Sequence, residues 1–311
     1  MLIDYHRRLA ADSVRTEAFR RAIERVVVPG VSRVGDLGSG TGWIGFMAHG
    51  CGARSVSLYE RVPSLAKVSQ AIARRNRLAD IQVYPEDSRA ILDPGPHDIV
   101  VSETLGNLAL EEGIGEILWD ARRFLAPGGI RIPSALTLYA RPVSSSRYWA
   151  ELDPWGQGGL GLDFSPLAVL SRQNLYVRTF SEADFARTPE ALPWDRVDFR
   201  LRFRARREGT LEWTVREGFT LHGFAIWWEA ELVPGIRLST APDQPPTHWE
   251  QIYAPIRTPV ALDAGDGIRL VIRSRFQDSQ GVDFRWQVTT PGGREQLSIR
   301  AGDLEKDPVE D

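Results

Sequence analysis

The chain has 311 residues, 42% hydrophobic and 25% charged, so it is long enough to bury a core and to divide it between two domains. It has no run of 18 apolar residues and no apolar segment typical of a signal peptide at its start, which predicts a soluble, cytoplasmic protein that does not enter a membrane. Cys51 is the single cysteine and the five histidines lack metal-ligand spacing, which excludes an intrachain disulfide and argues against a metal site. The net charge of −3 argues against a nucleic-acid partner and is compatible with a cationic substrate.

Residues 1–134 alternate between helical and strand patterns. Apolar residues at helical spacing from Phe19 to Val27 predict an amphipathic N-terminal helix. Short apolar runs predict strands at Arg33–Leu37, Ser55–Tyr59, Ile81–Tyr84 and Asp98–Val101, with helices at Ala66–Arg75 and Ile114–Phe124. This alternation indicates an α/β domain with a doubly wound, Rossmann-like parallel sheet that is covered on both faces.

Residues 135–311 follow a different pattern, an alternation of apolar and polar residues with period two. It predicts antiparallel strands, and hence a β-barrel or sandwich domain, from the runs Val197–Phe203, Glu229–Leu232, Ile268–Ile272 and Val282–Trp286. Between the two patterns, Trp149–Pro189 is rich in Gly, Pro and Leu and has weak periodicity. A connection of this length is usually either functional or disordered.

A glycine-rich segment, Asp36-Leu37-Gly38-Ser39-Gly40-Thr41-Gly42, follows the first predicted strand. Glycines permit positive φ angles and a close approach of the backbone to a ligand, and open α/β sheets bind ligands at this edge. An acid at the end of the second strand, here Glu60, can accept hydrogen bonds from ribose hydroxyls. Asp87 and Ser88 follow the third strand. A nicotinamide-dependent enzyme is disfavoured because GxGxxG is absent and no hydride-transfer histidine is evident.

The pattern D-x-G-x-G-x-G resembles motif I of the class I methyltransferases. This resemblance implies S-adenosyl-L-methionine as the cofactor. It also implies a set of cofactor-binding residues, in which the glycines approach the methionine moiety and the residues after the third strand bind the adenine: Asp36, Gly38, Gly40, Glu60, Asp87 and Ser88.

The segment after the fourth predicted strand, Ser102–Glu112, carries three glutamates. A guanidinium group is protonated near neutral pH and presents a planar fork of N–H donors, which carboxylates bind through charge-assisted hydrogen bonds. Two close carboxylates repel each other unless cations join them. A sulfonium and a guanidinium would together balance two carboxylates, so such a site selects a cationic acceptor.

Three segments resemble the protein arginine methyltransferases. The pattern S-E-x-x-G-x-x-x-x-x-E is similar to their double-E loop and implies Glu103 and Glu112 as catalytic residues, although a shift of one residue would give the second role to Glu111. Thr247-His248-Trp249 resembles their T-H-W loop. The segment His6–Thr16 resembles the family segment that ends in D-x-V-R-T, which implies that Arg15 binds the carboxylate of the cofactor and that His6 approaches the cofactor. In the same pattern Asp12 pairs with His248 and orients it, and Asp12 could also serve as a helix N-cap.

The resemblance also implies a dimerisation arm at residues 149–189 and a homodimer. Thr104, Asn107 and Ile114 depart from the family pattern, and the aromatic lid motif that precedes His6 in the family is missing. These departures leave three acceptors open: an arginine of a protein, a small guanidino metabolite, or another nucleophile of a ribosomal protein or RNA. A catalytically silent dimeric homologue is the remaining alternative.

Overall fold

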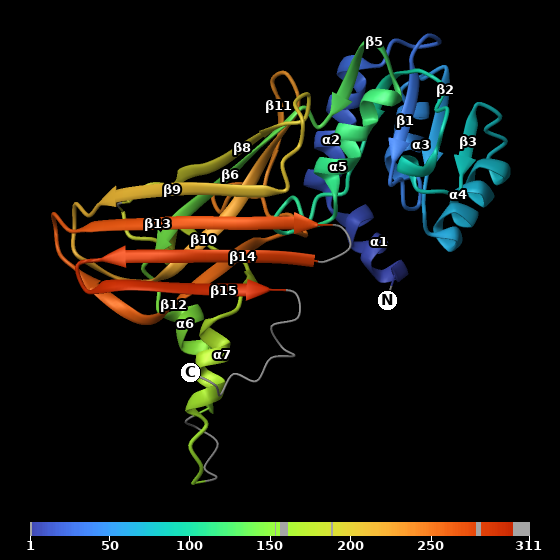
Figure 1. The fold of residues 1–311 in the computed structure, drawn as a ribbon. Coiled ribbons are helices and arrows are strands. Elements are labelled where there is room, and N and C mark those ends of the chain that lie inside the picture. The colour runs from blue at the N-terminus through green and yellow to red at the C-terminus, as the bar shows by residue number, and fades with distance from the viewer. Residues whose placement is uncertain (1, 153, 156–160, 188, 278–280, 301–311) are drawn as a thin grey trace. The chain divides into compact units, whose positions relative to one another are not determined.

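The computed structural model describes residues 2–152, 154–155, 161–187, 189–277 and 281–300 (Figure 1). The chain forms two compact units. The first unit contains Met1–Leu136 together with two later segments, Val197–Phe203 and Glu229–Ser239. The second unit contains Thr137–Arg196, Arg204–Trp228 and Thr240–Asp311.

A parallel sheet of five strands forms the centre of the first unit. Its strand order is β3-β2-β1-β4-β5, with β1 (Arg33–Leu37), β2 (Ser55–Tyr59), β3 (Ile81–Tyr84), β4 (His97–Val101) and β5 (Leu125–Ile132). The chain moves outward in one direction from β1 to β3 and then returns to the other side of β1 with β4. This reversal is the switch point at which doubly wound sheets bind ligands, and the Rossmann-like prediction is confirmed.

The helices of the first unit are α1 (Leu2–Ala11), α2 (Ser13–Val26), α3 (Trp43–Gly50), α4 (Pro63–Arg75) and α5 (Ile114–Asp120). The side chain of Asp12 caps α2 by accepting a hydrogen bond from the backbone N–H of Arg15 at 2.9 Å. The apolar face of α2 is buried through Phe19, Ala22 and Ile23, as its periodicity predicts, and α2 contacts β11 (Ile236–Ser239) of the same unit.

The helix predicted at Ile114–Phe124 is shorter than expected. It ends at Asp120 and is followed by one 3₁₀ turn, η2 (Ala121–Arg123). The N–H of Phe124 donates to the carbonyl of Ala121 at 3.0 Å, a three-residue spacing that tightens the last turn and ends the helix.

The second half of the chain forms antiparallel strands, which confirms the predicted β domain. One sheet has the order β7-β12-β10-β6-β8, with β11 paired to β10, and a four-stranded sheet has the order β15-β14-β13-β9. Their strands are β6 (Ala135–Val143), β7 (Tyr176–Arg178), β8 (Leu192–Asp198), β9 (Arg206–Thr214), β10 (Phe219–Val233), β12 (Gln251–Leu262), β13 (Gly267–Gln277), β14 (Gly281–Thr290) and β15 (Gly293–Arg300).

The strand predicted at Val197–Phe203 is wrong over most of its length. The observed strand β8 begins at Leu192 and ends at Asp198. The carboxylate of Asp198 accepts a hydrogen bond from the backbone N–H of Arg200 at 2.9 Å. This local bond is typical of an aspartate that starts a turn, and it competes with continuation of the strand.

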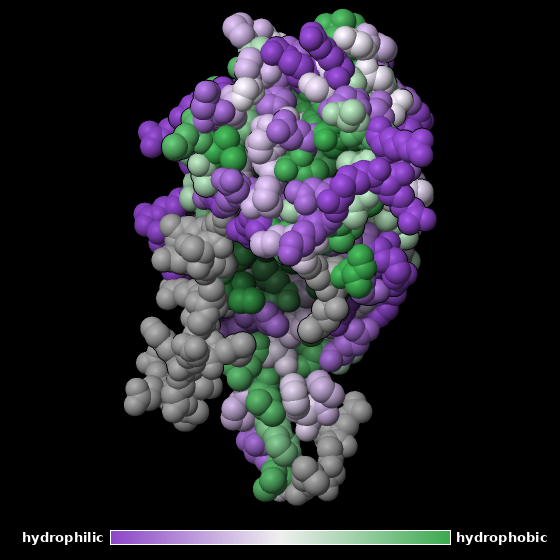
Figure 2. Space-filling view, turned by 90° about the vertical axis from the view of Figure 1, so that its right-hand side faces the viewer, coloured by the Kyte–Doolittle hydropathy of each residue, from purple (hydrophilic) through white to green (hydrophobic). Residues whose placement is uncertain are grey.

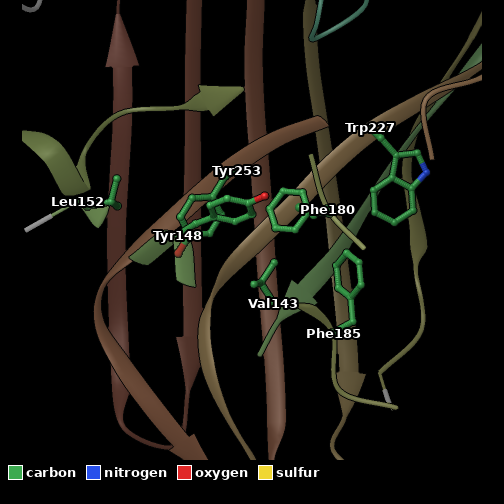
Figure 3. Close-up of a cluster of buried hydrophobic side chains, with 8 residues drawn as sticks. Val143, Tyr148, Leu152, Phe180, Phe185, Trp227 and Tyr253 are labelled. Atoms are coloured by element: carbon green, nitrogen blue, oxygen red, sulfur yellow. The ribbon is translucent and has the colours of Figure 1, made fainter. Parts of the chain in front are cut away.

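The segment around Trp149–Pro189 contains α6 (Arg147–Glu151), α7 (Ser165–Arg172) and the short strand β7. Its two ends pack on β10 and β12 through a cluster of buried side chains: Val143, Tyr148, Leu152, Phe180, Phe185, Ala225, Trp227 and Tyr253 (Figure 3). The rings of Tyr148 and Phe180 are 5.1 Å apart in a T-shaped arrangement, which adds a specific aromatic contact to the apolar burial. This cluster fixes the base of the segment to the second unit.

A pair of glycines on α3 tests the packing of helix against sheet. A Cβ atom at Gly45 would overlap the side chain of Leu58 on β2, whereas one at Gly50 would meet nothing within 4 Å. We expect Gly45→Ala to lower the free energy of unfolding by about 1–3 kcal/mol through overpacking. Gly50→Ala should change it by less than about 0.5 kcal/mol. Urea denaturation followed by circular dichroism measures both, and equal effects would contradict the packing described.

Candidate active site

A narrow cavity of about 40 Å³ lies at the carboxyl edge of the parallel sheet, between α1, the glycine-rich turn after β1 and the loop after β4. Six residues predicted from the sequence line it: His6, Arg15, Asp36, Gly38, Gly40 and Glu103. The other lining residues are Leu9, Ala10, Ser39, Thr41, Trp43 and Ile44. The fold therefore brings three separated segments of the sequence to one site.

The turn after β1 requires glycine for two reasons. Gly38 and Gly40 have φ angles of 71° and 57°, in the left-handed region that favours glycine. A Cβ atom on Gly40 would also lie 2.7 Å from Cε1 of His6, and one on Gly38 would lie 2.8 Å from Cγ2 of Thr104. The bare backbone of the turn thus faces α1 directly, and burial lowers the pKa of the His6 imidazole above it.

Two carboxylates hold the turn in place. Glu60, at the end of β2, accepts hydrogen bonds from the backbone N–H groups of Gly40 and Val62, each at 2.7 Å. Asp36 accepts one from the N–H of Gly45 at 2.9 Å. Burial raises the pKa of Asp36 to about 7.

Asp87 and Ser88 form a separate local structure. Asp87 caps the short turn Ser88–Ala90 and pairs with Arg89, whose guanidinium holds the pKa of Asp87 below its usual range. Ser88 is buried. Neither residue is among those that line the cavity, so their contact with an adenine stays a prediction.

The residue types around the cavity fit S-adenosylmethionine. The glycines allow the backbone to approach a ligand, and Arg15 offers a cation for a carboxylate. Glu60 is not among the lining residues and both its oxygens accept backbone N–H groups, so its contact with ribose hydroxyls stays a prediction. Helix α1 covers the glycine turn at this cavity.

Glu103 forms a buried ion pair with Arg15. The Nε–H of Arg15 donates to the Glu103 carboxylate at 2.8 Å, and a second guanidinium nitrogen donates to the same oxygen. The two side chains are 5% and 7% exposed, so neither charge is well solvated. The predicted contact of Arg15 with a cofactor carboxylate stays a prediction, because the observed partner of Arg15 is Glu103.

Glu111 and Glu112 have different hydrogen-bond partners. The carboxyl group of Glu111 points into the loop and accepts a hydrogen bond from the backbone N–H of Leu108 at 2.7 Å, close against Gly106. Burial raises its pKa to about 7. Glu112 instead accepts a hydrogen bond from the Tyr5 hydroxyl at 3.3 Å. Glu111 therefore shapes the loop, and Glu112 is the candidate for the second acceptor carboxylate.

Glu112 and Glu103 lie close enough to affect each other. Glu112 is exposed as a residue, but protein atoms surround its carboxyl group. This desolvation is the main cause that raises the pKa of Glu112 to about 7, and repulsion from Glu103 is the second. Solvent access to the same side chain limits the rise. Desolvation beside Glu112 likewise raises the pKa of Tyr5. A cation placed between the two glutamates would relieve the repulsion.

Tyr5 is a site residue that the sequence interpretation missed. It lies on α1 next to His6, so a single helix places one side chain over the glycine turn and another on Glu112. Helical periodicity could have indicated this position. Tyr5 and Leu9 are four residues apart, as are His6 and Ala10, so a helix places all four side chains on one broad face. That segment was interpreted only through its resemblance to a family motif.

The T-H-W segment belongs to the second unit, whereas Asp12 belongs to the first. Trp249 is 2% exposed and packs against Trp228, with ring centroids 4.9 Å apart, and Thr247 is buried. The rings of His248 and Trp249 are 3.9 Å apart. The pairing of Asp12 with His248 stays a prediction.

No group of three or more His, Cys, Asp or Glu residues in the described part of the chain could hold a metal ion. None of the helices described is long and apolar enough to span a membrane.

The strand order, the glycine turn after β1 and the acid after β2 define a Rossmann-like methyltransferase fold joined to an antiparallel β domain. A family model for the PRMT5 oligomerisation domain matches residues 135–301, which is more than half of the chain. The chain belongs to the protein arginine methyltransferase family.

Individual relatives agree with this assignment. An arginine N(omega)-methyltransferase of Streptomyces achromogenes is 29% identical over 272 residues, which cover 86% of this chain and 74% of the relative. A probable protein arginine N-methyltransferase 3 of Arabidopsis thaliana is 28% identical over 83% of this chain, which spans about half (47%) of that relative.

Solved structures share the fold. The PRMT1 enzyme–prozyme complex of Trypanosoma brucei with AdoHcy superimposes with a TM-score of 0.83 at 22% identity, covering 95% of this chain and 98% of that one. Protein arginine methyltransferase 10 of Arabidopsis thaliana gives a TM-score of 0.79 at 20% identity, covering 96% and 100%.

The buried Glu111 carboxyl makes a testable contribution to stability. Its pKa is raised in the folded protein, so the folded state holds the proton more tightly than the unfolded state does, and this stabilisation is lost as the pH rises from about 4.5 to about 7. We expect Glu111→Gln to gain stability relative to the wild type over this range, by up to about 3 kcal/mol, and to gain no more above pH 7. Urea unfolding at pH 5, 6, 7 and 8 measures the difference. A difference that does not change with pH would contradict a buried, protonatable carboxyl.

Proposed function

We propose that this protein transfers a methyl group from S-adenosylmethionine to a nitrogen of a guanidinium group. Family membership and the names of its relatives support this activity, and the site offers a chemical reason for it. The observation that carries the proposal is the placement of Glu103 at the cavity of the glycine turn, with Glu112 near enough to repel it.

The two glutamates suit a planar cation. Arg15 already compensates the charge of Glu103, whereas Glu112 accepts a hydrogen bond from a neutral phenol, Tyr5. An acceptor guanidinium would therefore find its strongest attraction at Glu112 and could share a second hydrogen bond with Glu103. A neutral acceptor would leave the repulsion between the carboxylates uncompensated.

S-adenosylmethionine, when bound, would supply an electrophilic methyl group on a cationic sulfur. We assign its binding to His6, Arg15, Asp36, Gly38, Gly40, Glu60, Asp87 and Ser88. The chain's own contribution is to position the acceptor nitrogen, to exclude water from it and to place charge around it. Glu103 or His248, the latter oriented by Asp12, accepts the proton that the nitrogen releases.

The acceptor is either an arginine in a protein or a free guanidino compound. The Streptomyces relative is named an arginine methyltransferase, whereas the relatives from plants and animals are named protein or histone-arginine methyltransferases. Thr104 and Asn107 give this loop fewer aromatic side chains than the family pattern has, which suits either acceptor. Incubation with labelled cofactor and either free arginine or arginine peptides, followed by mass spectrometry, distinguishes the two. Methylation of lysine peptides or RNA alone would overturn the proposal.

Glu112→Gln tests the role of the second carboxylate. The amide still accepts a hydrogen bond from Tyr5 but carries no charge, so we expect turnover to fall by roughly 10²-fold or more while calorimetry shows unchanged cofactor binding. In the wild type, kcat/KM for the acceptor should rise with pH up to about 7, as Glu112 ionises, and the variant should lose this dependence. Glu24→Gln, which alters an exposed acid on α2, is the control. Turnover that survives in Glu112→Gln would remove the assigned role.

We also propose that residues 149–189 are a dimerisation arm and that the protein is a homodimer. The part of this segment around α7 exposes several apolar side chains, among them Leu162 (70% exposed) and Val169 (49%). Figure 2 shows hydrophobic side chains along the segment that carries α7. Apolar patches of this kind mark interaction sites.

Val169→Asp tests the arm. A charge at the centre of an apolar contact is costly to bury, so we expect the variant to sediment as a monomer at concentrations where the wild type is a dimer. Leu201→Asp replaces an apolar residue that is 65% exposed outside the arm, and it should not change the mass measured by analytical ultracentrifugation. A wild type that is monomeric at every concentration would refute the dimer.

A further inference from the structure

A groove of about 540 Å³ lies on the four-stranded sheet of the second unit, and none of the residues assigned to methyl transfer is among those that line it. Five arginines and two acids line it, together with Ser274: Arg206, Arg207, Glu208, Arg273, Arg275, Asp283 and Arg285. This excess of positive charge contrasts with the net charge of −3 of the whole chain.

The strand register places like charges directly opposite each other in this groove. Arg273 on β13 lies opposite Arg285 on β14, and Arg275 lies opposite Arg206 on β9. Like charges directly opposite on neighbouring strands are destabilising. The same register also places Arg273 opposite Glu208 and Arg275 opposite Asp283. Three ion pairs offset part of this cost: Arg273–Glu208, Arg285–Asp283, and Arg207 with Asp195, which does not line the groove. An anionic ligand would offset the rest.

The C-terminal end of the same chain has the complementary charge. Residues 301–311, which lie outside the described residues, follow β15 and contain five acids and one lysine in Ala301-Gly302-Asp303-Leu304-Glu305-Lys306-Asp307-Pro308-Val309-Glu310-Asp311. We propose that the groove is a docking site for this acidic segment, Asp303–Asp311.

The topology places Arg300, the residue that precedes the segment, two strands from Arg275 of the groove. Arg300, the last residue of β15, is in register with Asp283, which is in register with Arg275 of β13. The ends of β13 and β15 therefore lie at the same side of the sheet, as their arrowheads in Figure 1 show. Two strand spacings amount to about 10 Å, which about three extended residues can cross.

Carboxylates match the groove better than a nucleic acid does. Guanidinium groups bind carboxylates through paired hydrogen bonds, and side chains spaced along an extended peptide can meet arginines on successive strands. The residues that line the groove include no aromatic ring on which a base could stack. The tether also raises the effective concentration of the segment to the millimolar range, so a weak contact would suffice.

A competition experiment on the full-length chain tests this proposal without reference to methyl transfer. The recipient is a variant whose tail acids are neutralised, Asp303→Asn, Glu305→Gln, Asp307→Asn, Glu310→Gln and Asp311→Asn. The probe is a fluorescent synthetic peptide with the natural sequence of residues 301–311, followed by anisotropy at low salt. We expect the peptide to bind the tail-neutral chain with a submillimolar Kd. This binding should be about tenfold tighter than binding to the wild type, because the wild type's own tail competes with the peptide. It should weaken at 0.5 M salt.

Adding Arg206→Ser and Arg275→Ser to the tail-neutral chain should weaken binding of the peptide by about tenfold or more, because these changes remove two of the cations. Adding Arg21→Ser and Arg216→Ser, at two exposed arginines outside the groove, should leave binding unchanged. Circular dichroism of each variant checks its folding. Equal binding to the wild-type and tail-neutral chains, or no loss in the groove variant, would overturn the proposal. So would tighter binding of a single-stranded oligonucleotide than of the peptide.

Discussion

The buried ion pair between Arg15 and Glu103 is the interaction on which the candidate site depends. It joins α2, near the start of the chain, to the loop after β4. Removing one partner of such a pair costs about 3–5 kcal/mol because the other charge is left buried and uncompensated. The pair therefore fixes the N-terminal helices over the carboxyl edge of the sheet, where the glycine turn lies.

The same pair makes the two glutamates of the acceptor loop unequal. Glu103 is buried and paired with Arg15, whereas Glu112 accepts a hydrogen bond from the neutral Tyr5 hydroxyl. Desolvation, followed by repulsion from Glu103, raises the pKa of Glu112. One carboxylate thus belongs to the scaffold as much as to the acceptor site. The other is the group whose charge most needs a cation, and this asymmetry gives an acceptor guanidinium a preferred side.

Local patterns in the sequence contained most of this fold. Four of the five parallel strands and α2 follow from apolar periodicity, and the glycine turn follows from the spacing of Gly38 and Gly40. The fifth strand, β5 (Leu125–Ile132), was not predicted. The sequence could not show where each strand ends or which distant segments pack together. The strand predicted from Val197 to Phe203 ends early because Asp198 bonds to the backbone of its own turn, and the membership of Glu229–Ser239 in the first unit depends on packing against α2.

Within the site, the choice between Glu111 and Glu112 also required the structure, because adjacent glutamates have the same chemistry in a sequence. Only the direction of each carboxyl group separates them: Glu111 turns inward to the N–H of Leu108, and Glu112 turns to Tyr5. Tyr5 was missed for a related reason. A resemblance assigns roles only to residues within the matched segment, which begins at His6.

Helix α1 connects the donor and acceptor parts of the site. His6 lies over Gly40 of the glycine turn, and Tyr5, the preceding residue, donates to Glu112. A helix moves largely as a unit because its backbone hydrogen bonds are internal. Any displacement of α1 would therefore move His6 relative to the glycine turn and the Tyr5 hydroxyl relative to Glu112 at the same time.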